Sequence, residues 1–135
     1  MLLVDDNSAT NFLNRKIIET TDLVSHINVA TNGMEALDCI TKKGQYANEK
    51  CTKANIIFLD INMPQMDGYE FLEHYRNLDD ALKAEIIVVF LTTSNWHKDK
   101  EKTRNNDLIF EYIEKPLSKK KFIEIYDYYI GITQH

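Results

Sequence analysis

The amino-acid sequence predicts an α/β protein in which five strands form a parallel sheet and five helices cover its two faces. Two observations carry this prediction. Apolar runs alternate with segments of helical periodicity along the 135 residues, which is the pattern of repeated strand–helix–strand units. Two of the apolar runs, 56–59 and 86–91, are nearly continuous, as is typical of central parallel strands that are buried on both sides.

Five apolar stretches are the predicted strands: 1–4, 26–30, 54–60, 85–94 and 109–115. The stretch at 85–94, EIIVVFLTTS, has the strongest strand character, and 26–30 has the weakest. The stretch ANIIFLD, at 54–60, is a continuous apolar run that ends in an acid. The polar segment 44–53 is predicted to be a loop.

Five segments are the predicted helices: 8–20, 33–40, 68–76, 97–106 and 118–130. The segment 97–106 is polar, whereas the other four have apolar residues at helical spacing. These residues are Phe12, Leu13 and Ile17; Met34, Leu37 and Ile40; Phe71, Leu72 and Tyr75; and Phe122, Ile125, Tyr126, Tyr129 and Ile130. Ser8 is predicted to cap the first helix, and Asp67 the third.

The composition is that of an ordinary soluble domain, with 44% hydrophobic and 27% charged residues, and we expect one domain over residues 1–135. No apolar run reaches the roughly 20 residues that span a bilayer, so we expect no membrane segment and a cytoplasmic location. The net charge of −5 argues against nucleic-acid binding. Cys39 and Cys51 lack CxxC spacing and are expected to be free buried thiols, and the four histidines lack metal-ligand spacing.

Polar side chains follow four of the predicted strands. Asp5 and Asp6 follow the first strand, and Asp60 ends the third. Thr92, with Thr93 and Ser94, ends the fourth strand, and Lys115 ends the fifth. Since the carboxyl ends of parallel strands share one edge, where such sheets bind ligands, we expect these side chains to converge.

Three carboxylates at one edge require a cation, because like charges 4 Å apart repel by about 1 kcal/mol in water and about 4 kcal/mol at an effective dielectric of 20. Oxygen ligands of this kind suit Mg²⁺, which also pairs with phosphate oxygens. A lysine and a threonine hydroxyl beside the metal would neutralise and hydrogen-bond a phosphoryl group. Unrelated helix caps would explain each residue alone, but not the set.

Four motifs together resemble the receiver domain of bacterial response regulators: LLVDDN at 2–7, FLDINMPQMDG at 58–68, FLTTS at 90–94 and YIEKP at 112–116. The resemblance covers essentially the whole chain. It implies a flavodoxin-like, CheY-like fold with strand order 2-1-3-4-5. It also implies that Asp60 is phosphorylated by a histidine kinase or phosphotransfer protein, and that Asp5, Asp6, Asp60 and the backbone carbonyl of Asn62 hold Mg²⁺.

The same resemblance implies roles for three further residues. Thr92 and Lys115 would bind the phosphoryl oxygens, and Tyr112 would swing inward when Thr92 moves toward the phosphate. The chain would be a signalling module rather than an enzyme, although it would catalyse its own phosphorylation and dephosphorylation. It would act on a downstream protein, and the face made by 97–106, 109–115 and 118–130 could bind that target or a second copy.

Other functions fit the residues less well. A receiver that binds partners without phosphorylation is the main alternative, and the complete set of acids, Thr92 and Lys115 argues against it. A haloacid-type phosphatase needs a second acid two residues after the nucleophile, where this chain has Asn62. An EF-hand reading of 60–71 fails, since Gly68 lies too far along and no glutamate occupies position twelve.

Overall fold

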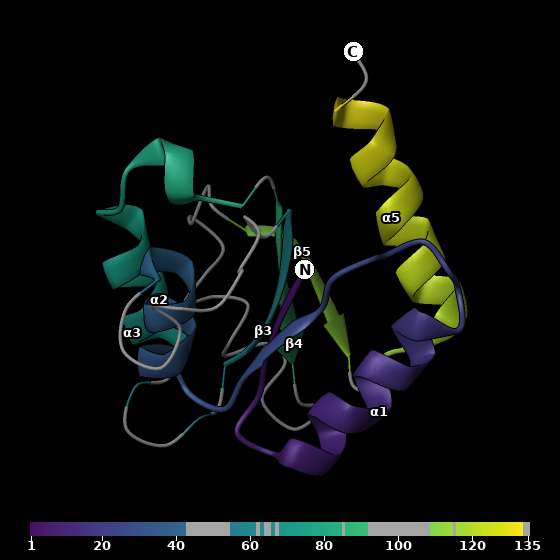
Figure 1. Cartoon of the computed structure of the whole chain (residues 1–135), viewed down its shortest axis with the longest axis horizontal. Coiled ribbons are helices and arrows are strands. Elements are labelled where there is room, and N and C mark those ends of the chain that lie inside the picture. The colour runs from purple at the N-terminus through teal and green to yellow at the C-terminus, as the bar shows by residue number, and fades with distance from the viewer. Residues whose placement is uncertain are drawn as a thin grey trace.

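The protein is a three-layer structure with one parallel sheet between two layers of helices (Figure 1). The computed structural model describes residues 1–42, 55–61, 63, 66, 68–84, 86–91, 109–114 and 116–133. The strands are β1 (Leu2–Val4), β2 (Asn28–Ala30), β3 (Ile56–Asp60), β4 (Ile86–Leu91) and β5 (Ile109–Glu114). Their order is β2-β1-β3-β4-β5, and all neighbours are parallel, which confirms the predicted sheet.

The helices are α1 (Ser8–Glu19), α2 (Gly33–Thr41), α3 (Gly68–Arg76) and α5 (Lys119–Thr133), with a short 3-10 helix, η2 (Asp80–Leu82). Helices α2 and α3 cover one face of the sheet, and α1 and α5 cover the other (Figure 1). The part of the chain that the structure describes therefore holds four α-helices rather than the predicted five. The predicted helix 97–106 and the predicted loop 44–53 lie outside the described residues.

Two hydrophobic clusters fill the spaces between the layers. In the cluster beneath α3, Phe71, Leu72 and Tyr75 are buried as predicted. The cluster on the other face has Phe58 at its centre, with ring centroids 5.8 Å from Phe90 and 6.1 Å from Phe122. On α5, the predicted apolar face is confirmed: Phe122, Ile125 and Tyr129 are buried, and Tyr126 and Ile130 are half-buried.

Helix α1 does not bury the face that its apolar residues suggest. Phe12 is 58% exposed and Leu13 is 60% exposed, while Asn11, Asn14 and Ile18 face the sheet. Asn7, rather than the predicted Ser8, is the N-cap, and its Oδ1 accepts hydrogen bonds from the N–H groups of the second and third following residues. Residues 11, 14 and 18 share one face of the helix, and this is the face that meets the sheet.

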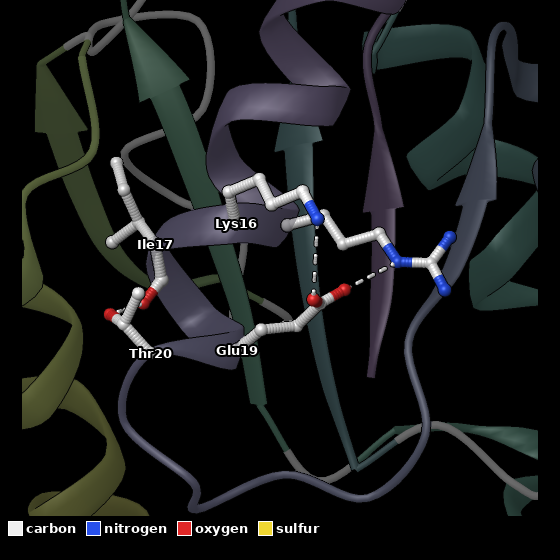
Figure 2. Close-up of polar contacts among 5 residues, drawn as sticks. Lys16, Ile17, Glu19 and Thr20 are labelled. Atoms are coloured by element: carbon white, nitrogen blue, oxygen red, sulfur yellow. Dashed lines mark hydrogen bonds and ion pairs between the residues drawn. The ribbon is translucent and has the colours of Figure 1, made fainter.

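The solvent side of α1 carries charged side chains. In Figure 2, Lys16 and Glu19 lie one turn apart, and their Nζ and Oε2 atoms are 3.9 Å apart. The other oxygen of Glu19 is 2.9 Å from Nε of Arg15. At the helix end, the Thr20 hydroxyl donates to the carbonyl of Ile17 at 2.6 Å. Pairs this exposed stabilise a helix by only a few tenths of a kcal/mol, roughly 0.3–0.5 each, so packing holds α1 in place.

The predicted apolar face of helix α2 is confirmed in part, because Leu37 and Ile40 are half-buried and pack against the core cluster. Met34 is 53% exposed, and the buried residues are Gly33, Ala36 and Cys39. These small side chains allow α2 to approach α3 and the sheet closely, and a Cβ on Gly33 would lie 2.7 Å from atoms of the Met66 side chain. Cys39 is free and buried as predicted, and Cys51 lies outside the described residues.

None of the helices in the described ranges is both long and apolar enough to cross a membrane.

Candidate functional site

Three acids meet at the carboxyl edge of the sheet, as the sequence predicts. One carboxylate oxygen from each of Asp5, Asp6 and Asp60 lies within 4.8 Å of the other two. Sheet register brings Asp5 beside Asp60: Val4 of β1 pairs with Leu59 of β3, so the next residue in each chain segment lies at the same level of the sheet edge. Asp5 is 1% exposed and Asp60 is 2% exposed, whereas Asp6 is open to solvent.

Backbone hydrogen bonds fix the turn that carries the first two acids. The N–H of Asp5 donates to the carbonyl of Ala30 at 3.1 Å, which extends the β1–β2 ladder by one residue. The N–H of Asn7 then donates to Oδ1 of Asp5 at 2.9 Å and reverses the chain into α1. Asn7 thus holds the Asp5 carboxylate through its backbone and caps the helix with its side chain.

One residue that holds this turn, Asn11 of α1, was not predicted from the sequence. Its side-chain amide donates to the carbonyl of Asp5 at 2.8 Å and to that of Ala30 at 3.4 Å, and the residue is 2% exposed. A signal was available in the spacing, because Asn11 precedes Ile18 by seven residues and so shares its helix face. The apolar residues Phe12 and Leu13 instead predicted that a different face of the helix is buried.

The backbone after Asp60 is also held closely. The N–H of Gly68 donates to the carbonyl of Ile61 at 2.9 Å, so the first residue of α3 closes the loop that follows β3. A Cβ on Gly68 would lie 2.8 Å from Cα of Ile61 and 2.9 Å from the carbonyl oxygen of Asp60. Only glycine permits this approach without displacing the backbone of the acid. Met63 and Met66 are buried in the same core cluster as residues of α2 and α3.

The donor set at this edge fits a hard divalent cation. Three carboxylates within 4.8 Å repel one another by about 1 kcal/mol per pair in water and about 3 kcal/mol at an effective dielectric of 20. A shared ion removes this repulsion, and carboxylate oxygens are the ligands that Mg²⁺ prefers. Asp5, Asp6 and Asp60 are therefore the residues that could hold such an ion.

The remaining predicted site residues are placed only in part. Asn62, Thr92 and Lys115 lie outside the described residues, as does Asp67. Leu91 at the end of β4 pairs with Glu114 at the end of β5, and Thr92 and Lys115 are the next residues in the sequence.

Tyr112 is part of β5, is half-buried and packs against the core cluster beneath α2 and α3. It lies two residues beyond a β-bulge, because Ile87 pairs with Ile109 and Val88 pairs with Glu111. Phe110 is the extra residue of the bulge and packs on the face covered by α5, where its ring centroid lies 4.5 Å from that of Tyr128.

Residues 1–127 match the model of the response regulator receiver domain. This chain belongs to that family. Receiver domains are mainly signalling phosphoacceptors of two-component systems, and they interact with histidine kinases or phosphotransfer proteins. The resemblance seen in the four strand-end motifs is thereby confirmed.

Relatives of this receiver domain differ in length. It is 30% identical over 132 residues to the polar-differentiation response regulator DivK of Brucella anthropi, covering 97% of this chain and 95% of that protein. It is 29% identical over 99 residues to response regulator Rcp1 of Synechocystis, covering 73% of this chain and 65% of Rcp1. Against hybrid signal transduction histidine kinase B of Dictyostelium discoideum it is 29% identical over 126 residues, covering 87% of this chain and 6% of the kinase.

Solved structures agree with the fold. A two-component response regulator from Cytophaga hutchinsonii superimposes with a TM-score of 0.77 at 28% identity, covering 96% of this chain and 95% of that one. The phosphorylated cyanobacterial phytochrome response regulator RcpA gives a TM-score of 0.71 at 28% identity, covering 97% of this chain and 88% of that one. The acid cluster of this receiver domain matches the acidic pocket at which receiver domains generally bind Mg²⁺.

Proposed function

We propose that this chain accepts a phosphoryl group on Asp60, in a Mg²⁺-dependent reaction, from a histidine kinase or a phosphotransfer protein. The observation that carries the proposal is the approach of three carboxylate oxygens to within 4.8 Å, with Asp60 buried at the end of a central strand. Asp5, Asp6, Asp60 and the backbone carbonyl of Asn62 hold the ion. The family of the chain and its similarity to a phosphorylated response regulator support the same assignment.

In this reaction the residues of the chain contribute position rather than covalent chemistry. A carboxylate oxygen of Asp60 forms a bond to phosphorus while the bond from phosphorus to the donor's imidazole nitrogen breaks, and that nitrogen keeps the electron pair. Asp60 is 2% exposed, and β1 and β4 hold its strand from both sides, so the position of its carboxylate is fixed. When bound, Mg²⁺ supplies charge neutralisation for the acids and the transferred group.

Thr92 and Lys115 bind the phosphoryl oxygens in this proposal, and Tyr112 turns inward as Thr92 moves. The pairing of Leu91 with Glu114, which directly precede Thr92 and Lys115 in the sequence, supports their joint role. The half-buried state of Tyr112 is compatible with a switch, because a partly exposed ring can gain further burial. The acyl phosphate then hydrolyses, with Asp60 restored, so the signal is temporary.

Residues 1–135 act as one domain in this proposal. The domain passes the signal to a downstream protein and binds neither nucleic acid nor a membrane. The face that carries β5 and α5 contacts the target or a second copy. We assign the reaction to the cytoplasm, where a kinase has access to ATP. A protein of this kind is a phosphoacceptor rather than an enzyme that turns over a separate substrate, although it catalyses its own phosphorylation and dephosphorylation.

Acetyl phosphate, which can replace a phosphorylated partner, provides the test. The protein is incubated with acetyl phosphate and Mg²⁺, and intact mass is recorded before and after base treatment. We expect one base-labile phosphoryl adduct, which is lost in Asp60→Asn and when Mg²⁺ is chelated. Asp127→Asn, an exposed acid on α5, is the matched control and should still be phosphorylated. Absence of an adduct on the wild type, or its persistence in Asp60→Asn, would contradict the proposal and favour a receiver that acts without phosphorylation.

A further inference from the structure

We infer that Asn11 is a positioning residue for the cation site, holding the peptide group that joins Asp5 to Asp6. This inference rests on the proposed Mg²⁺ site at the three acids. Asn11 belongs to α1 and has no place in the motifs of the sequence, yet its side chain reaches the carboxyl edge of the sheet.

The hydrogen bonds of Asn11 define this role. Its Nδ2 donates to the carbonyl oxygen of Asp5 at 2.8 Å, and to that of Ala30, at the end of β2, at 3.4 Å. The Ala30 carbonyl also accepts the N–H of Asp5 at 3.1 Å. One amide therefore ties α1 to the ends of both β1 and β2, and the backbone of Asp5 is held on its N–H side and its carbonyl side.

The planarity of the peptide bond extends this restraint to the second acid. The carbonyl of Asp5 and the N–H of Asp6 belong to the same rigid plane, so fixing the carbonyl direction fixes where the chain leaves Asp5 and enters Asp6. If the peptide rotated, the two carboxylates would turn relative to each other and to Asp60. The group that Asn11 holds is thus the link between two of the three acids.

Packing alone does not explain an asparagine at this position. Asn11 is 2% exposed, and its Oδ1 is buried without a hydrogen-bond partner among the residues that the structure describes. Burying an amide with one unsatisfied atom costs free energy, and a leucine of similar size would avoid that cost. The feature that leucine cannot supply is the donor to the Asp5 carbonyl.

Asn14 offers a matched control on the same helix. It lies one turn further along the inward face and is 4% exposed. No hydrogen bond joins its side chain to the acid-bearing turn within the described part of the chain. Substitution of Asn14 therefore tests the cost of changing a buried asparagine on α1 without changing the restraint on Asp5.

The experiment measures Mg²⁺ affinity by isothermal titration calorimetry and by the NMR shifts of the Asp6 and Asn7 amides. Asn11→Leu should raise the Mg²⁺ dissociation constant about 10-fold, which is at the lower end of the losses in affinity caused by removing a group that orients a metal ligand. Asn14→Leu should change the dissociation constant less than about 2-fold. With acetyl phosphate, the Mg²⁺ concentration at half-maximal rate should rise by the same factor in Asn11→Leu. The rate at saturating Mg²⁺ should change less than about 3-fold, because Asn11 contacts neither the ion nor the reacting atoms.

Urea unfolding in the presence of EDTA gives the stability of each variant without Mg²⁺, and so distinguishes a loss of Mg²⁺ affinity in a folded variant from a loss of the fold. Asn11→Ser, which is smaller and keeps a hydroxyl donor, is the second variant if Asn11→Leu is not folded, and its dissociation constant should rise at least about 3-fold. Wild-type Mg²⁺ affinity in a folded Asn11 variant, or an equal loss of affinity in Asn14→Leu, would overturn the inference. Failure of the proposed function is a different result, in which the wild type itself binds no Mg²⁺ or forms no adduct.

Discussion

Replacing Gly68 with alanine adds one methyl group at the point where α3 begins against the backbone of the phosphoacceptor strand. Helix propensity alone predicts a gain in stability, because alanine is favoured over glycine in a helix by about 1 kcal/mol. Contact geometry predicts the opposite. The new Cβ would lie 2.8 Å from Cα of Ile61 and 2.9 Å from the carbonyl oxygen of Asp60, and both of these are backbone atoms.

The magnitude follows from how far those atoms must move. Ordinary carbon contacts begin near 3.5 Å, so α3 or the backbone after β3 must shift by roughly 0.6 Å. Such overpacking typically costs about 1–3 kcal/mol, and the propensity gain is smaller at the first residue of a helix than in its interior. We therefore expect Gly68→Ala to lower the free energy of unfolding by about 1–2 kcal/mol, which is a fall in Tm of roughly 5 °C for a chain of this size.

Urea and thermal unfolding followed by circular dichroism measure this change, and Gly131→Ala is its control. Gly131 lies in α5, is exposed, and a Cβ there would meet nothing within 4 Å. That variant should be more stable than the wild type by about 0.5 kcal/mol, since only propensity acts. If Gly68→Ala is as stable as the wild type while Gly131→Ala behaves as expected, the close approach of α3 to Asp60 is refuted.

Four further variants test other parts of the structure. Burial raises the pKa of Tyr75 to about 12, and the N–H of Ala84 donates to its hydroxyl, so Tyr75→Phe should cost about 1–2 kcal/mol at pH 8. The pKa of Tyr75 is higher in the folded protein than in the unfolded chain, so the stabilisation by its neutral hydroxyl is complete below pH 10 and is lost toward pH 12. The difference in free energy of unfolding between wild type and Tyr75→Phe, measured in urea, should therefore narrow from about pH 10 to 11. A constant gap would contradict this. Replacing Phe12 and Leu13 with serine should change the free energy of unfolding by less than about 0.5 kcal/mol each, because both are exposed, and a loss above 2 kcal/mol would show that they are buried. Asp6→Asn should raise stability by about 1 kcal/mol in EDTA by relieving repulsion, and should abolish the stabilisation by Mg²⁺ seen in thermal unfolding of the wild type; an unchanged response to Mg²⁺ would contradict the acid site.

The elements that the sequence predicts well are those in which one physical signal dominates. The runs at β3 and β4 are apolar throughout because both faces of a central strand are covered, and no helix-like spacing competes. The acid edge was also predictable, because parallel strands end at the same edge of the sheet, although the register that places Asp5 beside Asp60 is seen only in the structure. Strand ends were less accurate: the predicted 26–30 is β2 only over Asn28–Ala30.

Helix α1 shows why the rest could not be predicted. Its apolar residues Phe12 and Leu13 favour one face, but the face that meets the sheet is the one from which Asn11 donates hydrogen bonds to the carbonyls of Asp5 and Ala30. Both interactions depend on where β1 and β2 stop in space, which local periodicity does not contain. On α2 the departure is limited to Met34, since Leu37 and Ile40 of the predicted face pack against the core.

The geometry of the acid site is set by residues that carry no charge. Sheet register places Asp5 beside Asp60, Asn11 holds the peptide before Asp6, and Gly68 closes the backbone after Asp60. Repulsion among the acids would separate them in a flexible loop. Hydrogen bonds therefore hold the backbone on both sides of Asp5 and after Asp60, and the N–H of Asn7 donates to one oxygen of the Asp5 carboxylate. It follows that substitutions at Asn11 and Gly68 should weaken the site while leaving every acid in place, whereas a search for acidic motifs alone would pass over both positions.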